Sequence, residues 1–331
     1  MKIVSLFSGA GGLDLGFINA GHTVVWANDV IEDCVSTYRR NIGSHIHFGD
    51  ISKVNIDEIP AADMVIGGFP CQGFSVANMS RDSKDPRNRL YLEYLRILRG
   101  KKPAFFLAEN VKGIMSLEGG QVFKRIIKDF EACGYSIKHC VVNAADYGVP
   151  QTRQRVVIAG TRSGIDYDLQ WPPRASHSRH RIPGFKQWIS VGQALRDIPD
   201  PIDKHSLLNH VCSQYKLKHT GFINHRPVDP SKPAPTVTAR GDMKGGAMIN
   251  HHPNNKRRMS VREAAIVQSF PLEFEFVGAM TSCYLQVGNA VPPLLAQALA
   301  KNFPLSVPKR RKRVSKDSPR EVLQLDLGWA I

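Results

Sequence analysis

Cys71 lies in the segment of this sequence whose composition most strongly suggests chemistry. The segment reads Gly-Gly-Phe-Pro-Cys-Gln-Gly over residues 67–73 and directly follows an apolar run. Proline fixes φ and removes a hydrogen-bond donor, while glycine permits conformations that other residues avoid. This pattern predicts a rigid turn at the end of a buried strand, where a thiolate could act as a nucleophile in a cleft. The alternative is an inert core cysteine, which is where most free thiols lie.

A carboxylate and two guanidinium groups follow later in the chain. Glu109 comes directly after the apolar run 102–108, which predicts a strand. Arg153 and Arg155 are two residues apart on a strand predicted over 153–160, so they share one face. Two arginines on one face fit a site for an anionic or carbonyl group, although an exposed sheet edge would give the same pattern.

A glycine-rich turn near the N-terminus points to a nucleotide-like ligand. An apolar strand over residues 2–7 runs into Ser-Gly-Ala-Gly-Gly at 8–12, as at the start of doubly wound α/β domains. The glycine spacing departs from Gly-x-Gly-x-x-Gly, so no dinucleotide fingerprint is indicated. Asp29 and Asp50 stand at the ends of the next two predicted strands. Asp29 could bind ribose hydroxyls and Asp50 an adenine amino group, or each could cap a helix or turn.

The sequence predicts alternating strands and helices as far as residue 164, and these elements would position the residues described above. The polar stretch 78–89 interrupts them and predicts a mobile active-site loop. Further strands are predicted at 22–28 and 137–143, and helices at 31–41, 90–98 and 120–133. We therefore assign residues 1–164 to an α/β domain that binds the cofactor and carries the catalytic residues.

The alternation is lost near residue 161, where prolines, histidines and arginines dominate. Residues 165–255 predict a smaller, loop-rich domain with short strands. Helical periodicity returns at 260–268 with a capping box of Ser260 and Glu263, so 256–305 is assigned back to the α/β domain. The remainder, 306–331, opens on a basic run and predicts a disordered tail.

Composition narrows the class of protein further. The chain has 331 residues and a formal net charge of +15, which favours a polyanion such as nucleic acid as partner. Its 6 cysteines are scattered and form no Cys-x-x-Cys pair, so neither a metal site nor a disulfide framework is indicated. No apolar run is long enough to span a bilayer and no signal-peptide pattern is present, so we expect a cytoplasmic protein without membrane contact.

Six segments together resemble the motifs of the DNA (cytosine-5) methyltransferases, of the compact bacterial restriction–modification type. In order, they are FSGAGGLDLGF (7–17), GGFPCQGFS (67–75), ENVKG (109–113), QTRQR (151–155), RMSVREAAIVQSFP (258–271) and QVGNAVPP (286–293). The resemblance implies a Rossmann-like domain that binds S-adenosylmethionine. It also implies a target-recognition domain between the fourth and fifth motifs and a last helix that folds back onto the large domain. Phe69 departs from the second proline that many relatives carry there.

The resemblance assigns catalytic roles to four residues. Cys71 would attack C6 of a flipped-out cytosine, and Glu109 would bind N3 and the exocyclic amine. Arg153 and Arg155 would hold O2, and C5 would then accept the methyl group. The implied cofactor-binding residues are Phe7, Gly9, Gly11, Gly12, Leu13, Asp29, Asp50, Ile51, Pro70, Leu90, Asn289 and Ala290.

Double-stranded DNA is the expected partner, read in part by Thr236 and Arg240 on a strand-like run. We further expect a monomer that is functionally paired with a restriction endonuclease but forms no stable complex with it. Three alternatives stay open. They are an RNA-directed homologue, which would usually have a smaller variable domain, a non-catalytic DNA-binding relative, and a nicotinamide oxidoreductase of similar fold. A labelled-methyl transfer assay separates them from the main hypothesis.

Overall fold

The computed structural model describes residues 1–70, 86–212, 217, 227–239 and 250–308. Cys71, Arg240, most of the polar stretch 78–89 and nearly all of the basic tail lie outside these residues.

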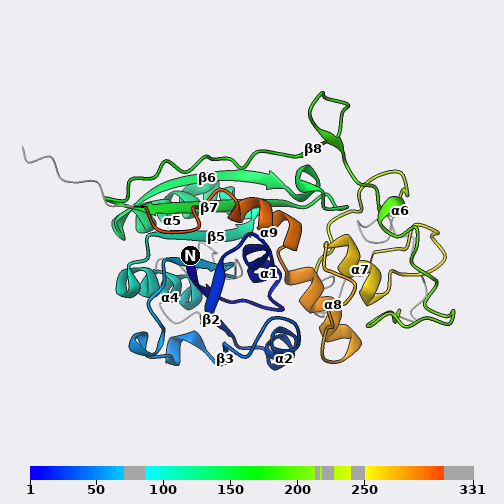
Figure 1. Ribbon diagram of the computed structural model, residues 1–331, viewed down its shortest axis with the longest axis horizontal. Coiled ribbons are helices and arrows are strands. Elements are labelled where there is room, and N and C mark those ends of the chain that lie inside the picture. Colours follow the sequence, from blue (N-terminus) through cyan, green and yellow to red (C-terminus); the bar gives the residue numbers. More distant parts are fainter. Residues whose placement is uncertain (71–85, 213–216, 218–226, 240–249, 309–331) are drawn as a thin grey trace, which may run out of the picture.

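The central element is a seven-stranded sheet in the order β3-β2-β1-β4-β5-β7-β6 (Figure 1). Its first five strands are parallel, whereas β7 runs antiparallel to both β5 and β6. The strands are β1 (Lys2–Leu6), β2 (Thr23–Asp29), β3 (Ile46–Phe48), β4 (Met64–Gly67), β5 (Phe105–Val111), β6 (Tyr135–Asn143) and β7 (Gln154–Arg162). The central strands are almost wholly apolar because layers on both faces of the sheet bury them. The carboxyl ends of the five parallel strands therefore meet at one edge, where doubly wound folds place their ligands.

Helices cover both faces and create two separate cores. On one face, α1 (Gly12–Asn19), α2 (Glu32–Asn41) and α9 (Pro293–Ala300) pack on alternate strand residues such as Ile3 and Phe105. On the other face, α4 (Pro86–Lys101) and α5 (Gln121–Ala132) pack on Val4 and Phe106. This alternation follows from the period of two in a strand. The α/β class expected from the sequence is confirmed.

The returning C-terminal helix is held closely against the first helix. A Cβ atom on Gly16 would lie 2.6 Å from the Pro293 carbonyl oxygen and 2.3 Å from the Ala296 Cβ, so only glycine allows α9 to approach α1 this closely. The N-terminal ammonium group also donates a 2.6 Å hydrogen bond to the Leu305 carbonyl. The two ends of the described fold are thereby tied together.

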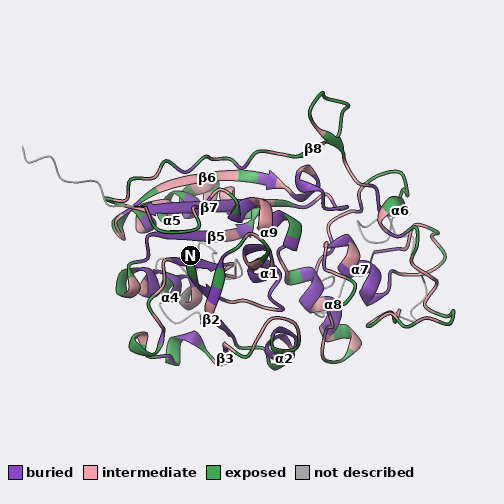
Figure 2. Cartoon of the chain, viewed as in Figure 1, coloured by how far each residue is buried: buried purple, intermediate pink, exposed green. Residues whose placement is uncertain are grey.

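The smaller unit has its own core, built from two parts of the chain. Val191 and Val237 come from the middle segment, whereas Met259, Phe276 and Tyr284 come from the segment that returns. Its helices are α6 (Val191–Ala194), α7 (Val261–Val267) and α8 (Met280–Asn289). The predicted capping box of Ser260 and Glu263 is present at α7. In Figure 2 the buried residues of this unit gather on α7 and α8, with exposed loops around them.

The domain boundary predicted after residue 164 does not coincide with a break in packing. Leu169 is buried in the large-domain core, and the Tyr167 hydroxyl donates to the Asn302 carbonyl at 2.8 Å, so the segment after residue 164 still packs on the sheet. The change in composition near 161 marks the end of the strands of the large sheet, not the end of this packing.

A second small sheet pairs β8 (His177–Ser178) with β9 (Lys186–Gln187). No helix among the described residues is long and apolar enough to cross a membrane.

Candidate active site

A cavity of about 690 Å³ opens at the carboxyl edge of the parallel strands. The ends of β1, β2, β4 and β5 contribute to its walls, together with the start of β7, the segment 238–239, and the last turn of α8 with the two residues after it. Among the predicted site residues, those on its lining are Phe7, Gly9, Leu13, Asp29, Pro70, Glu109, Arg153, Arg155, Asn289 and Ala290. The cavity therefore gathers residues of five of the six sequence motifs.

Asp29 forms one wall together with the glycine turn. Its two carboxylate oxygens accept hydrogen bonds from the backbone N–H groups of Gly9 at 2.8 Å and Ile31 at 2.9 Å. Burial raises the pKa of Asp29, and these hydrogen bonds oppose that rise. A carboxylate has about four lone-pair sites, so Asp29 can still accept hydrogen bonds from a ligand. Asp29 lines the cavity, and its contact with a ribose stays a prediction. The alternative role, a cap for the helix that follows, is wrong, because the N-cap residue of α2 is Ile31 and no side chain among the described residues caps this helix.

A buried polar network supports the glycine turn from behind. Asp14 is completely buried and accepts hydrogen bonds from the Ser5 hydroxyl at 2.6 Å and the Tyr38 hydroxyl at 2.7 Å. Burial raises the pKa of Asp14 to about 6, although both hydrogen bonds lower it. Ser5 also lines the cavity, and Tyr38 lies on α2. The hydrogen bonds of Asp14 therefore connect the cavity wall to α2.

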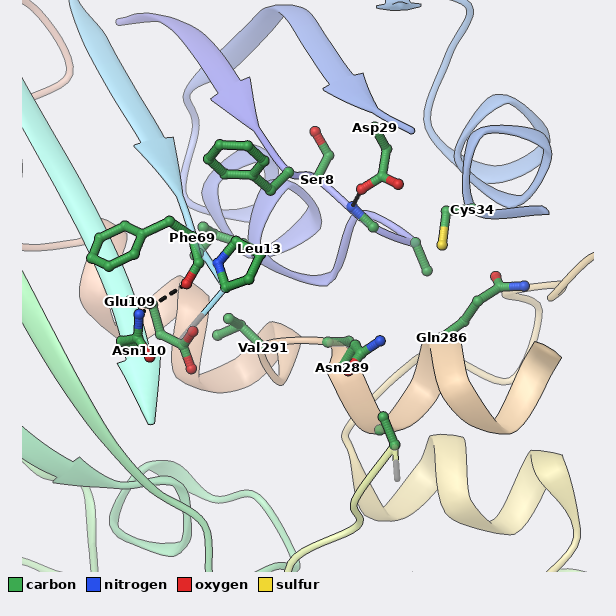
Figure 3. A pocket seen from close by; sticks show the side chains of 18 of the residues that line it. Ser8, Leu13, Asp29, Cys34, Phe69, Glu109, Asn110, Gln286, Asn289 and Val291 are labelled. Atoms are coloured by element: carbon green, nitrogen blue, oxygen red, sulfur yellow. Dashed lines mark hydrogen bonds between the residues drawn. The ribbon is translucent and has the colours of Figure 1, made fainter. Parts of the chain in front are cut away.

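Glu109 forms the opposite wall with Arg155, across the cavity from Asp29 (Figure 3). The Glu109 Oε1 and Arg155 Nε atoms are 2.8 Å apart, and only 12% of each side chain is exposed. Glu109 lies near the carboxyl end of β5, which ends at Val111, so the predicted position of a carboxylate at this strand end is confirmed. Antiparallel pairing of β5 with β7 brings the two groups together, because Val111 is opposite Arg155.

Asn110 connects this wall to the turn that precedes Cys71. Its Nδ2 group donates a 2.8 Å hydrogen bond to the Phe69 carbonyl, and Figure 3 shows this bond beside Glu109. Gly68 is also close, because a Cβ atom there would lie 3.1 Å from Glu109 Oε2. The last described residues before Cys71 are therefore held against Glu109. Cys71 itself is outside the described residues.

Arg153 does not have the environment that the sequence suggested. It precedes β7, it is 2% exposed, and its guanidinium group donates to backbone carbonyls from two other segments. The acceptors are Val237 at 2.7 Å, Gly288 at 2.9 Å and Ala290 at 3.0 Å. Burial and the neighbouring Arg155 lower the pKa of Arg153. Arg153 therefore fastens Val237 and the end of α8 to the start of β7. It also lines the cavity, so a contact of both arginines with one ligand group stays a prediction.

Two glutamines extend this joint, and the sequence analysis gave them no role. Gln151 accepts from the Val237 N–H at 2.9 Å and donates to the Gln268 side chain at 2.7 Å. Gln268 in turn donates to the Val287 carbonyl at 2.6 Å. Both glutamines are 0% exposed. The one available signal was their position inside two of the sequence motifs, 151–155 and 258–271.

Other predicted residues lie behind the cavity wall. Gly12 faces the Val291 carbonyl, which would be 2.4 Å from an added Cβ, and Gly11 precedes α1 with a φ of 88°. Asp50 caps a turn by accepting from the Ser52 N–H at 2.9 Å, while Ile51 is buried in the core. Leu90 packs against that same core. The Thr236 hydroxyl donates to the Thr152 carbonyl at 2.7 Å. None of these residues is on the described lining.

The described residues contain no group of three or more His, Cys, Asp and Glu side chains placed to hold a metal ion. Cavity residues missed from the sequence include Cys34, Thr238, Ala239 and Gln286. Burial raises the pKa of the Cys34 thiol, and the nearby carboxylates Asp29 and Asp33 add to this effect. Cys34 is therefore a protonated wall residue at neutral pH, not a nucleophile.

Comparison with known proteins agrees with this geometry. A sequence model of the family described as C-5 cytosine-specific DNA methylase matches residues 1–304. The Type II methyltransferase M.NgoFVII of Neisseria gonorrhoeae is 39% identical over 325 residues, covering 91% of this chain and 86% of that protein. M.FnuDI of Fusobacterium nucleatum, another Type II methyltransferase, is 36% identical over 332 residues, covering 94% and 96%.

A solved structure of a Spodoptera frugiperda DNMT2 mutant has the same fold. Its TM-score is 0.67 at 20% identity, and the match covers 91% of this chain and 98% of that one. The sequence motifs, the sheet with its antiparallel β7 and the family match over nearly the whole chain all lead to one assignment. The chain belongs to the C-5 cytosine-specific DNA methylase family and is a DNA (cytosine-5)-methyltransferase of restriction–modification type.

Proposed function

We propose that the chain transfers a methyl group from S-adenosylmethionine to C5 of a flipped-out cytosine within a specific duplex DNA sequence, through a covalent Cys71–C6 adduct. The observation that carries this proposal is the cavity in which the Glu109–Arg155 ion pair lies opposite Asp29. One wall suits a pyrimidine and the other suits a ribose.

Three side chains divide the work on the base. The Cys71 thiolate adds to C6, which makes C5 electron-rich enough to accept a methyl group. A base then removes the C5 proton, and the C6–S bond breaks to release Cys71 and the methylated cytosine. Glu109 shares a proton with N3 and binds the exocyclic amine as charge develops on the ring. Arg155 holds O2 while its Nε keeps Glu109 in place. We assign Arg153 a holding role, because its terminal nitrogens already donate to backbone carbonyls.

S-adenosylmethionine fits the rest of the cavity. Asp29 ends β2 with spare acceptor capacity for ribose hydroxyls, and the backbone turn at Gly9 allows close approach of a ligand. When bound, the cofactor would supply an electrophilic sulfonium methyl group. Phe7, Leu13, Pro70, Asn289 and Ala290 would enclose it and exclude water.

Burial of the catalytic pair is the argument for base flipping. Glu109 and Arg155 are each 12% exposed and lie in a cavity, so a base stacked in a duplex cannot reach them. Extruding the nucleotide costs a few kcal/mol and places both faces of the ring within reach. The domain of residues 165–255 would select the sequence, with Thr236 and Arg240 as its DNA-contacting residues. Thr236 would have to act while its hydroxyl donates to Thr152.

The cellular role follows from the Type II relatives. We propose that the chain works in the bacterial cytoplasm as a monomer and protects host DNA from a partner endonuclease without a stable complex between them.

A labelled-methyl transfer assay with duplex DNA tests the activity, and a parallel assay with tRNA tests the RNA-directed alternative. Bisulfite sequencing of the methylated DNA gives the recognition sequence. Duplex carrying 5-fluorocytosine at the target should then trap a covalent adduct, because fluorine cannot leave as a proton does. Cys71→Ser should abolish trapping and retain cofactor binding, whereas Cys133→Ser, a cysteine outside the described cavity lining, should trap normally. An adduct on another cysteine would contradict the proposal.

A further inference from the structure

The excursion between β8 and β9 is a projecting loop, defined here as residues 177–187. It extends beyond the rest of the molecule in Figure 1 and is drawn mostly as exposed in Figure 2. Arg179, Arg181 and Lys186 are all exposed on it, and no Asp or Glu occurs between Asp168 and Asp197. Within the described part of the chain, no carboxylate forms an ion pair with these three cations. The loop therefore presents three uncompensated positive charges to solvent.

The base of the projecting loop is firmly anchored to the large domain. The Trp188 indole N–H donates to Asp146 Oδ1 at 2.9 Å, and the Ser176 N–H donates to the Asp146 carbonyl at 2.9 Å. The His177 ring packs on Gly148, where a Cβ atom would lie 2.9 Å from it. These contacts hold the cations in a defined direction and lower the entropic cost of using them in binding.

This anchor lies at the same edge of the sheet as the catalytic pair. Asp146 belongs to the 3₁₀ turn Ala144–Tyr147, which directly follows β6. At that end of β6, Val142 is opposite Arg155 of β7, and β7 in turn pairs with β5 and Glu109. Two strand spacings separate β5 from β6, which is about 10 Å along the edge.

We propose that the projecting loop binds the phosphate backbone of duplex DNA beside the target site, outside the recognition sequence. This inference rests on the proposed function of the cavity. The loop can extend about 18 Å if half of its residues run outward at about 3.3 Å each. Added to the offset of about 10 Å, this reaches phosphates about eight base pairs from the flipped cytosine, at about 3.4 Å per base pair. Arg179 and Arg181 on the exposed part of the loop, with Lys186 in β9 at its base, suit phosphates, which carry no sequence information.

The test compares two triple variants of equal charge. Arg179→Ala/Arg181→Ala/Lys186→Ala removes the loop cations, and Lys124→Ala/Arg125→Ala/Lys128→Ala removes three exposed cations from α5, which leads away from the catalytic edge. Binding to a duplex of about 40 base pairs and arbitrary sequence is measured from about 50 to 200 mM salt. The loop variant should show a slope of log K against log salt that is about two to three units shallower than that of the wild type. Wild-type affinity should accordingly fall about 16- to 64-fold more than variant affinity over this range.

Substrate length gives a second, independent measurement. On a duplex with long flanks the loop variant should have a DNA KM raised about 10-fold or more, whereas on a duplex with flanks of about three base pairs its KM should match the wild type. Arg179→Lys/Arg181→Lys keeps the charge and should restore binding. An unchanged salt slope in the loop variant, or an equal change in the α5 variant, would overturn the inference. If the wild type itself neither binds nor methylates DNA, the proposed function fails instead.

Discussion

Glu109 and Arg155 meet across two antiparallel strands, with Glu109 Oε1 2.8 Å from Arg155 Nε. The pairing of β5 with β7 fixes the backbone positions of both residues, so the two side chains are held close together. An ion pair that is only 12% exposed on each side contributes uncertain net stability, because desolvation of both charges offsets their attraction. We therefore interpret the pair as a means of orienting the Glu109 carboxylate in the cavity.

Glu109→Gln keeps the shape of the side chain and removes its ability to exchange a proton. We expect kcat to fall by at least about 100-fold, which is the usual range for loss of a general acid–base group. The cofactor KM should change little, because Glu109 lies across the cavity from Asp29. Single-turnover methylation separates these effects. Asp168→Asn is the control, since it breaks an exposed ion pair with Lys138 and should leave kcat unchanged.

Asp29→Ala should act on cofactor affinity. Lost charge-assisted hydrogen bonds are worth about 1.5–3 kcal/mol, or about 10- to 150-fold in the cofactor dissociation constant. Asp57→Ala is the comparison, because Asp57 is exposed and not on the cavity lining. Calorimetric titration with S-adenosylmethionine measures both variants. Normal affinity in Asp29→Ala combined with a low kcat would show that the ribose binds elsewhere.

Much of the large domain was predictable from the sequence, because its strands are apolar on both faces and end at glycine or acidic residues. Asp29 and Glu109 could be identified as cavity residues, since carboxyl ends of parallel strands share one edge. The α7 capping box was predictable because it depends on local spacing alone.

Long-range contacts account for what could not be predicted. Arg153 looks like a partner of Arg155 along the strand, and only the fold brings Val237, Gly288 and Ala290 to its guanidinium group. Gly12 is next to cavity residues in sequence, yet its lack of a side chain serves the approach of Val291. The packing of Leu169 on the large-domain core is equally invisible to composition.

Arg153→Lys should mainly lower stability, whereas Arg155→Lys should mainly lower kcat. A lysine at 153 cannot reach three carbonyls with a planar fork, so we expect the free energy of unfolding to fall by about 3 kcal/mol or more. Arg155→Lys loses its geometry toward Glu109 and should lower kcat with little change in stability. Urea denaturation and single-turnover kinetics on both variants test this division. Equal stability of the two variants would return Arg153 to the reacting base.

Gly16→Ala should weaken the joint between α1 and α9. The new Cβ would lie 2.6 Å from the Gln297 backbone nitrogen and from the Pro293 carbonyl oxygen. Overpacking of this kind costs about 1–3 kcal/mol, which exceeds the gain of up to about 1 kcal/mol from helix propensity. At the exposed Gly113 no atom would lie within 4 Å of a Cβ, so Gly113→Ala is the matched control and should be neutral. Thermal denaturation of both variants measures the difference.

Stability should depend on pH through Asp14. Its pKa is raised to about 6 in the folded protein by burial, against a usual value of 3.8. The folded state therefore binds more protons than the unfolded state between these two pH values, and stability contributed by this group is lost as pH rises from about 4 to about 6. The shift of about two units corresponds to about 3 kcal/mol. The free energy of unfolding can be measured by urea denaturation for the wild type and for Asp14→Asn at each pH. The wild-type value minus the variant value should fall by about 3 kcal/mol as the pH rises from about 4 to about 6.

Tyr38→Phe tests the cause of this titration without removing the carboxyl group. The Tyr38 hydroxyl donates a 2.7 Å hydrogen bond that lowers the pKa of Asp14. Losing it should raise the Asp14 pKa further, so the loss of stability should extend to higher pH than in the wild type. Because Ser5 joins Asp14 to the cavity wall, the cofactor affinity of Tyr38→Phe should be measured at the same pH values. The free energy of unfolding could instead change with pH in the same way for the wild type and Asp14→Asn from about pH 4 to about pH 7. That result would mean that Asp14 has the same pKa in the folded protein as in water.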